Sequence, residues 1–66
     1  MNKKDADKIR KYRLGKGYSI RELADAVGIT RQNLYMIEGG TANPSIKTCK
    51  SIAHVLGHSL DDLFDN

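Results

Sequence analysis

Apolar residues in this chain recur at the three- and four-residue spacing of one face of an α-helix. The recurring positions form three stripes: Leu23, Ala24 and Val27; Leu34 and Ile37; and Ile46, Cys49, Ile52, Ala53 and Leu56. No run of residues alternates strictly between apolar and polar, as a half-buried β-strand would. The pattern therefore predicts an all-α fold.

Helix-capping residues stand at the borders of these stripes. The run Ser19-Ile20-Arg21-Glu22 has the form of a capping box, in which the first and last side chains satisfy two backbone amides that otherwise lack a partner. Glycine commonly ends a helix because it adopts the left-handed conformation without strain. These residues predict five helices, which begin at about Asp5, Ser19, Thr30, Ser45 and Ser59, and the first four end at about Gly17, Gly28, Gly39 and Gly57.

Two of the predicted helices are joined by a very short turn around Gly28 and Ile29. So tight a connection forces the second helix to cross the first steeply, which is the geometry of a helix-turn-helix. Ala24 supplies a small residue for the closest contact between the helices, and Gly28 tolerates the positive φ that the turn favours. The sequence therefore predicts one helix-turn-helix that spans about residues 19–39.

The length of 66 residues suits a single domain over residues 1–66, with no linker or internal repeat. Cys49 is the only cysteine, which excludes an intramolecular disulfide and is typical of a protein in a reducing cytoplasm. No apolar run approaches the roughly 20 residues of a membrane span, and no signal-peptide core follows the basic N-terminus. We therefore expect a soluble, cytoplasmic protein without a membrane partner.

Positive charge is concentrated in the first half of the chain. Residues 1–31 hold nine of the eleven Lys and Arg residues against four acidic ones, whereas residues 32–66 hold two against four, so the formal charge of +3 divides into +5 and −2. A body with one basic end would orient toward a polyanion. The charge distribution alone is equally consistent with an ordinary solvated surface that binds no polyanion.

The capping residues, the glycines and the apolar residues of the predicted helices follow one another in a characteristic order and spacing. They lie in the stretches 18–24, 27–32, 37–40, 43–46, 52–57 and 59–64. In that order and spacing the chain resembles the Cro/repressor-type (XRE) helix-turn-helix family of DNA-binding transcriptional regulators, over about residues 9–64. The resemblance implies a compact five-helix, lambda-repressor-like domain in which the second and third helices form the helix-turn-helix. It also implies that the third helix enters the major groove of double-stranded DNA.

The resemblance places Arg31, Gln32 and Met36 at base-reading positions, with Asn33 and Tyr35 on the flanks of the same face. Arginine can contact guanine with two hydrogen bonds, and glutamine or asparagine can contact adenine in the same way. Met36 has no polar contact to offer, so we expect it to read a thymine methyl group or the shape of the groove.

Phosphate contacts are expected from two other places. One is the N-terminus of the second helix, where free amides and the helix dipole favour an anion. The other is the compact loop over residues 39–43. The family often carries glutamine at the position of Ile20, and since isoleucine cannot make that contact, Arg21 is expected to supply the charge. The candidate phosphate-binding residues are Ser19, Arg21, Thr30, Arg10, Thr41 and Asn43.

Two further expectations concern contacts between protein residues. Arg13 and Glu38 match a pair that joins the first helix to the end of the third in part of the family, so we expect a partly buried salt bridge. The apolar residues near the C-terminus are more than a chain of this length readily hides, and they suggest a homodimer that presents two recognition helices about one DNA turn (~34 Å) apart. The expected dimer surface consists of His54, Val55, His58, Leu60, Leu63 and Phe64.

These observations favour a transcriptional repressor that binds a palindromic operator as a homodimer, of the mobile-element or restriction-modification controller type. Its control is expected to come from its own concentration or from a separate regulatory protein. The alternative is an antitoxin or adaptor that uses the same fold to cover a protein partner. His54 and His58 lack a third ligand for a metal, and no cofactor is expected. No Ser/His/Asp or Cys/His set has supporting context, so we expect no enzyme.

Overall fold

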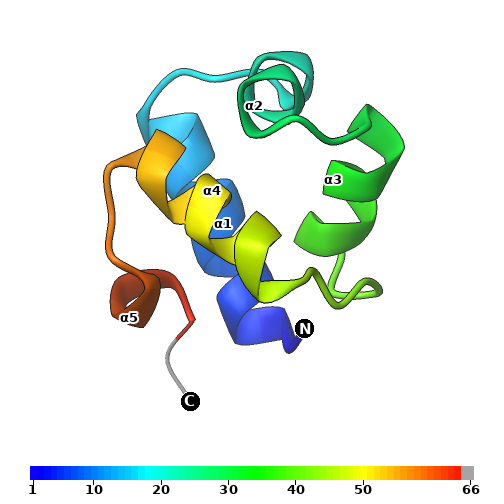
Figure 1. Cartoon of the computed structure of the whole chain (residues 1–66), viewed down its shortest axis with the longest axis vertical. Helices are drawn as coiled ribbons and strands as arrows, with labels where there is room; N and C mark the ends of the chain where they lie inside the picture. The colour runs from blue at the N-terminus through cyan, green and yellow to red at the C-terminus, as the bar shows by residue number, and fades with distance from the viewer. Residues whose placement is uncertain (65–66) are drawn as a thin grey trace.

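Five α-helices and no strand make up residues 1–64, the part of the chain that this computed structural model describes. They are α1 (Lys3–Gly15), α2 (Ile20–Val27), α3 (Arg31–Glu38), α4 (Ile46–Leu56) and α5 (Leu60–Leu63). In Figure 1, α4 crosses in front of α1 at the centre, α2 lies at the top, α3 at the right and α5 at the lower left. The predicted all-α fold is confirmed. No helix in the described residues has the length and apolar character that crossing a bilayer requires.

The predicted capping residues begin their helices as expected. The side-chain oxygens of Ser19, Thr30, Ser45 and Ser59 each accept a hydrogen bond from the backbone N–H three residues later, at 3.0 to 3.2 Å. The capping box is complete, because the Ser19 N–H also donates to the Glu22 carboxylate at 3.0 Å. Gly28 and Gly57 end α2 and α4 in the left-handed conformation. The four helix starts therefore follow from local chemistry.

The first helix begins earlier than the apolar pattern indicates. Its N-cap is Asn2, whose side chain accepts from the backbone N–H of Asp5 at 2.8 Å. A helix can begin at any residue whose preceding side chain satisfies the free amides, so α1 begins within the polar run before Ala6. The predicted start at about Asp5 was therefore late by two residues.

The core receives large side chains from all five helices. Those that are completely buried are Ile9, Leu23, Leu34, Ile37, Ile52, Leu56 and Leu63. Cys49 is only 8% exposed, in keeping with its place on the apolar stripe of α4. The expectation that Leu63 contacts a second protomer is wrong for this residue. Because α5 packs against α1 and α4, the Leu63 side chain is completely buried within one chain and has no surface left to contact a second protomer.

Candidate nucleic-acid interface

The connection between α2 and α3 has the geometry of a helix-turn-helix. Gly28 adopts a φ of 85°, and the N–H groups of Gly28 and Ile29 both donate to the Ala24 carbonyl, at 2.9 and 3.0 Å. Thr30 then caps α3. Ala24 is completely buried where the two helices approach, so a larger residue would push them apart. This short turn fixes the direction of α3 relative to the body of the domain.

One face of α3 is buried and the opposite face is open. Leu34 and Ile37 are completely buried. Because successive residues of an α-helix are rotated by about 100° around its axis, Gln32 lies on the side of α3 almost opposite Leu34 and Ile37. Gln32 is exposed accordingly. Its amide group is therefore the most outward polar group of the first two turns of α3.

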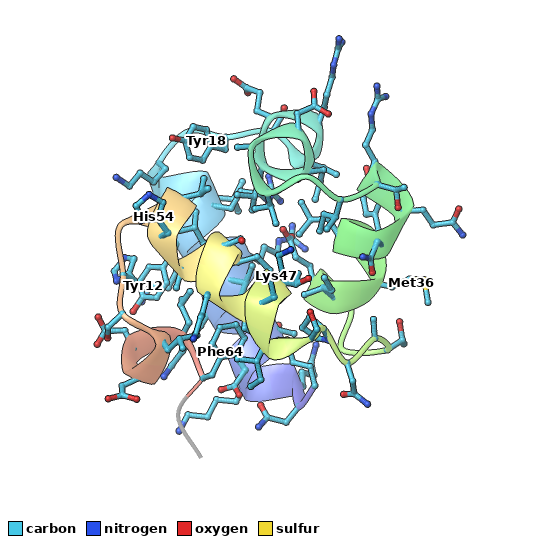
Figure 2. All side chains as sticks on the ribbon, viewed as in Figure 1. Tyr12, Tyr18, Met36, Lys47, His54 and Phe64 are labelled. Carbon is cyan, nitrogen blue, oxygen red and sulfur yellow. The ribbon has the colours of Figure 1, made fainter. Side chains whose placement is uncertain are left out.

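The remaining candidate base-reading residues flank Gln32 on two sides. Arg31 is exposed and Tyr35 is 63% exposed, and they lie on the side that leads toward Glu38. Met36 is 43% exposed and points away from the body of the molecule, as Figure 2 shows. Asn33 lies on the same side as Met36 but is half-buried. The exposed face of α3 thus combines a cation, an amide, a phenol and a thioether.

A buried ion pair holds the end of α3 against α1. The Arg13 Nε donates to Glu38 Oε2 at 2.7 Å, and a second guanidinium nitrogen donates to Oε1 at 3.1 Å. The third guanidinium contact goes to the Tyr18 carbonyl at 2.8 Å, in the loop before α2. The side chains of Arg13 and Glu38 are 9% and 7% exposed. The expected pair is confirmed, and its contact with Tyr18 also ties down the start of the helix-turn-helix.

A polar hollow of about 370 Å³ lies beside this ion pair. It is lined by Arg10, Arg13, Ile20, Tyr35, Glu38 and Gly39. Since the buried pair neutralises itself, the free positive charge at this hollow comes from Arg10. Arg10 is exposed and forms no hydrogen bond or ion pair with the rest of residues 1–64. The hollow therefore brings Arg10 and Tyr35, 25 positions apart in the sequence, to one place.

The N-terminus of α2 is partly occupied by its own capping box. The Ser19 backbone N–H and the Glu22 N–H are both bonded within the box. The hydrogen bond from the Ser19 backbone, together with that from its hydroxyl, lowers the pKa of Glu22. The free donors that remain are the amides of Ile20 and Arg21. The Ser19 hydroxyl, which donates to the Glu22 carboxylate, would have to turn away from it to contact a phosphate. Arg21 Nε lies 3.9 Å from the Asp25 carboxylate with both side chains 70% exposed, a weak pair that leaves the guanidinium accessible.

The loop after α3 differs from the sequence expectation. The backbone N–H groups of Thr41 and Ala42 both donate to the Met36 carbonyl, at 2.9 and 3.2 Å, and the Thr41 hydroxyl donates to the same oxygen at 3.2 Å. Gly40 donates to Ile37 at 3.1 Å. These donors satisfy free carbonyls at the end of α3, so Thr41 would have to give up its bonds to Met36 to contact a phosphate. Asn43 is exposed and forms none of these bonds.

The other singled-out residues have contacts within the chain. The His58 ring stacks on Tyr12 with 3.8 Å between centroids, and its Nδ1 lies 3.5 Å from the Asp62 carboxylate. The sequence gives no signal for this stack, since no local pattern links residues 46 positions apart. Burial raises the pKa of the Cys49 thiol, and the Asp5 carboxylate raises it further. Within the described part of the chain no three His, Cys, Asp or Glu residues gather as metal ligands.

Comparison with known proteins agrees with this geometry. The profile of the helix-turn-helix family matches residues 9–63. The chain belongs to the Cro/C1-type helix-turn-helix family. It thus has the helix-turn-helix DNA-binding domain of transcriptional regulators, as the resemblance implied.

Individual relatives extend this assignment. A prophage-derived helix-turn-helix transcriptional regulator of Bacillus subtilis, YonR, is 42% identical over 57 residues, which are 86% of this chain and 53% of YonR. The chain therefore spans about half the length of this relative. The N-terminal DNA-binding domain of SinR from Bacillus subtilis superposes with a TM-score of 0.90 at 35% identity, covering 98% of this chain and 96% of that domain.

A second solved structure contains SinR, the master regulator for biofilm formation, in complex with DNA. Its chain superposes with a TM-score of 0.87 at 37% identity, covering 92% of this chain and 98% of that chain. The fold found here is therefore one that a related regulator uses in a complex with DNA.

Proposed function

We propose that this chain is a transcriptional repressor that binds a palindromic operator as a homodimer, with α3 in the major groove. The observation that carries the proposal is the outward position of Gln32 on α3, opposite the completely buried Leu34 and Ile37. A glutamine presented in this way can form two hydrogen bonds with an adenine edge. Arg31 lies beside it and can read guanine, while Met36 suits a thymine methyl group. Asn33 would assist from the half-buried flank.

The proposed phosphate contacts surround this face on the side of α1 and α2. They are the Ile20 and Arg21 amides, the Arg21 guanidinium, the hydroxyl groups of Ser19 and Thr30, and Arg10 with Tyr35 at the polar hollow. Asn43 remains a candidate from the loop after α3. Such contacts position the protein on the duplex, and the base contacts then select the sequence. Because several of the donors are neutral, we expect a shallow salt dependence of DNA binding.

The proposed dimer surface lies over α5 and the end of α4. It keeps five of the residues expected from the sequence: exposed His54 and half-buried Val55, His58, Leu60 and Phe64. These side chains still offer apolar surface although Leu63 does not. We further propose that a separate regulatory protein controls the repressor and that the chain has no catalytic role.

The test is a binding titration by fluorescence anisotropy on DNA fragments from upstream of the gene, across a salt series. Gln32→Ala should cost about 1–3 kcal/mol on the preferred fragment and little on scrambled DNA. Arg21→Ala should weaken binding to all fragments alike and lower the salt slope by about one unit. Lys16→Ala is the matched control, because this exposed lysine lies beside Gly57 at the end of α4 and should leave binding unchanged.

If no upstream fragment is preferred, a selection from random DNA follows. A selected sequence that depends on Gln32 supports the proposal, and a palindrome within it supports the dimer. Failure to select any sequence contradicts DNA reading. The antitoxin or adaptor function would then be the candidate to pursue.

A further inference from the structure

A second hollow, of about 360 Å³, lies at the opposite end of the molecule from α2. It is formed where the first turn of α1, the segment before α4, the start of α4 and α5 meet, at the lower end of Figure 1. Its lining residues are Met1, Asp5, Asn43, Pro44, Ile46, Cys49, Leu60, Asp61 and Phe64. None of them belongs to α2 or α3, so this hollow is separate from the face proposed to read DNA.

A buried carboxylate at this hollow has one oxygen without a hydrogen-bond partner in residues 1–64. Asp5 is only 5% exposed, and its Oδ1 is inaccessible and forms no hydrogen bond. The nearby Met1 ammonium group donates instead to the Ala42 carbonyl at 3.2 Å. No cation within residues 1–64 forms an ion pair with Asp5. An unpaired carboxylate in such surroundings is costly, so a ligand that supplies a positive hydrogen-bond donor would gain a strong interaction here.

The walls around this carboxylate are apolar. Ile46 is 69% exposed although it is a large aliphatic residue, and Pro44, Leu60 and Phe64 complete the walls as half-buried residues. Asp61 adds a second carboxylate at the hollow. An aliphatic chain that ends in a positive charge matches both features, because its methylene groups pack on apolar side chains while its head bonds a carboxylate.

We propose that this hollow binds an aliphatic cation, that is, an alkylammonium or alkylguanidinium group, with its head on Asp5 and its chain against Ile46 and Phe64. The pKa of Cys49 is raised mainly by burial and further by the Asp5 carboxylate, so the thiol and this carboxylate lie close together in the same hollow. Such a group belongs either to a free small amine or to a lysine or arginine side chain of a partner protein. The proposal does not depend on whether α3 reads DNA. It shares Leu60 and Phe64 with the proposed dimer surface, so a dimer that covers these two side chains would exclude the ligand.

The test is a titration of the whole chain with n-butylguanidinium, followed by two-dimensional amide NMR at about 0.15 M salt, where exposed charges are screened beyond about 8 Å. We expect saturating shifts at residues that line the hollow. Asp5→Asn, which keeps the shape and removes the charge, should weaken binding by about tenfold. Asp7→Asn is the matched control, because Asp7 lies on the same helix, is exposed and pairs with Lys3. It should leave binding unchanged.

Three comparisons complete the test. Shifts of the same size with uncharged n-butanol would overturn the proposal, because the cation would then contribute nothing. Equal binding by Asp5→Asn and wild type would also overturn it. Shifts at the hollow that grow with protein concentration in the absence of probe would show that a second copy fills it, which contradicts a ligand site.

The source of the cation is distinguished by a blocked tripeptide, acetyl-Leu-Arg-Leu-amide, titrated beside n-butylguanidinium. Tighter Asp5-dependent binding of the tripeptide supports a side chain of a partner protein. Tighter binding of n-butylguanidinium supports a free small amine or guanidine. Absence of Asp5-dependent binding by either probe overturns the proposal.

Discussion

Replacing Glu38 by alanine should unfold a large part of the protein population. The substitution removes two charge-assisted hydrogen bonds, of 2.7 and 3.1 Å, and leaves the Arg13 guanidinium with only the Tyr18 carbonyl. Since the Arg13 side chain is only 9% exposed, water from the neighbouring hollow replaces the lost carboxylate only in part while the chain stays folded. Leaving one partner of a buried pair in this state costs about 3–5 kcal/mol. A chain of this length has a total stability of roughly 3–10 kcal/mol, so the loss is a large fraction of it.

The assay is urea unfolding followed by far-ultraviolet circular dichroism. Arg13→Met leaves the Glu38 carboxylate buried without its partner, so it should destabilise the fold by a similar amount. The double variant Arg13→Met, Glu38→Leu removes both charges and fills the space with apolar side chains. It should be far less destabilised than the sum of the two single variants, because neither charge is then left unpaired.

Two results would refute this reasoning. A loss below about 1 kcal/mol for Glu38→Ala would mean that the pair behaves like an exposed surface ion pair. Additive losses in the double variant would mean that the two side chains contribute independently and that the contact between them has no special value.

The remaining predictions concern single positions. Gly28→Ala should lower the free energy of unfolding by about 1–2 kcal/mol, because φ is 85° at this position, although the added Cβ meets no atom. Gly15→Ala, which is equally open but has right-handed helical backbone, should raise it by about 0.4–1 kcal/mol. Thermal unfolding of the two variants separates the effect of backbone conformation from that of crowding. Because the pKa of Glu22 is lowered in the folded state, the unfolded chain takes up the proton first as the pH falls. The stability that Glu22 contributes is therefore present above about pH 4.5 and is lost as the pH falls through the lowered pKa. Glu22→Gln should abolish this dependence in urea titrations at several pH values. Ser19→Ala should lower the free energy of unfolding by about 0.5–2 kcal/mol. It should also raise the pH at which the contribution of Glu22 to stability is lost, and an unchanged pH would contradict the capping box. The raised pKa of Cys49 predicts slow reaction with an aromatic disulfide reagent in the folded state, and equal rates in the folded and urea-unfolded states would contradict its burial.

Most of the secondary structure was predictable because its causes are local. The capping serines and threonine bond to amides three residues away, and Gly28 and Gly57 differ from other residues in the conformations that they tolerate. The inward positions of Leu34 and Ile37 follow from helical periodicity, and so does the outward position of Gln32. For these features the sequence by itself determined the result.

The start of α1 shows the limit of that local reasoning. The apolar stripe of α1 begins only at Ala6, so the pattern contains no signal for Asn2 as the cap. Several polar residues at the start of the chain could cap a helix, because each stands three positions before a backbone amide. The sequence alone does not select Asn2 among them.

Tertiary structure alone decided which polar groups remain free to bind. The Leu63 side chain lies in the core because α5 packs against α1 and α4. The Thr41 donors, in contrast, are used locally, on the Met36 carbonyl five residues earlier. The hollow with Arg10 and Tyr35, and the one with Asp5 and Phe64, join residues far apart in the chain. Whether a donor is spent or a carboxylate is left without a partner depends on what packs against it, and that is determined only when the helices have come together.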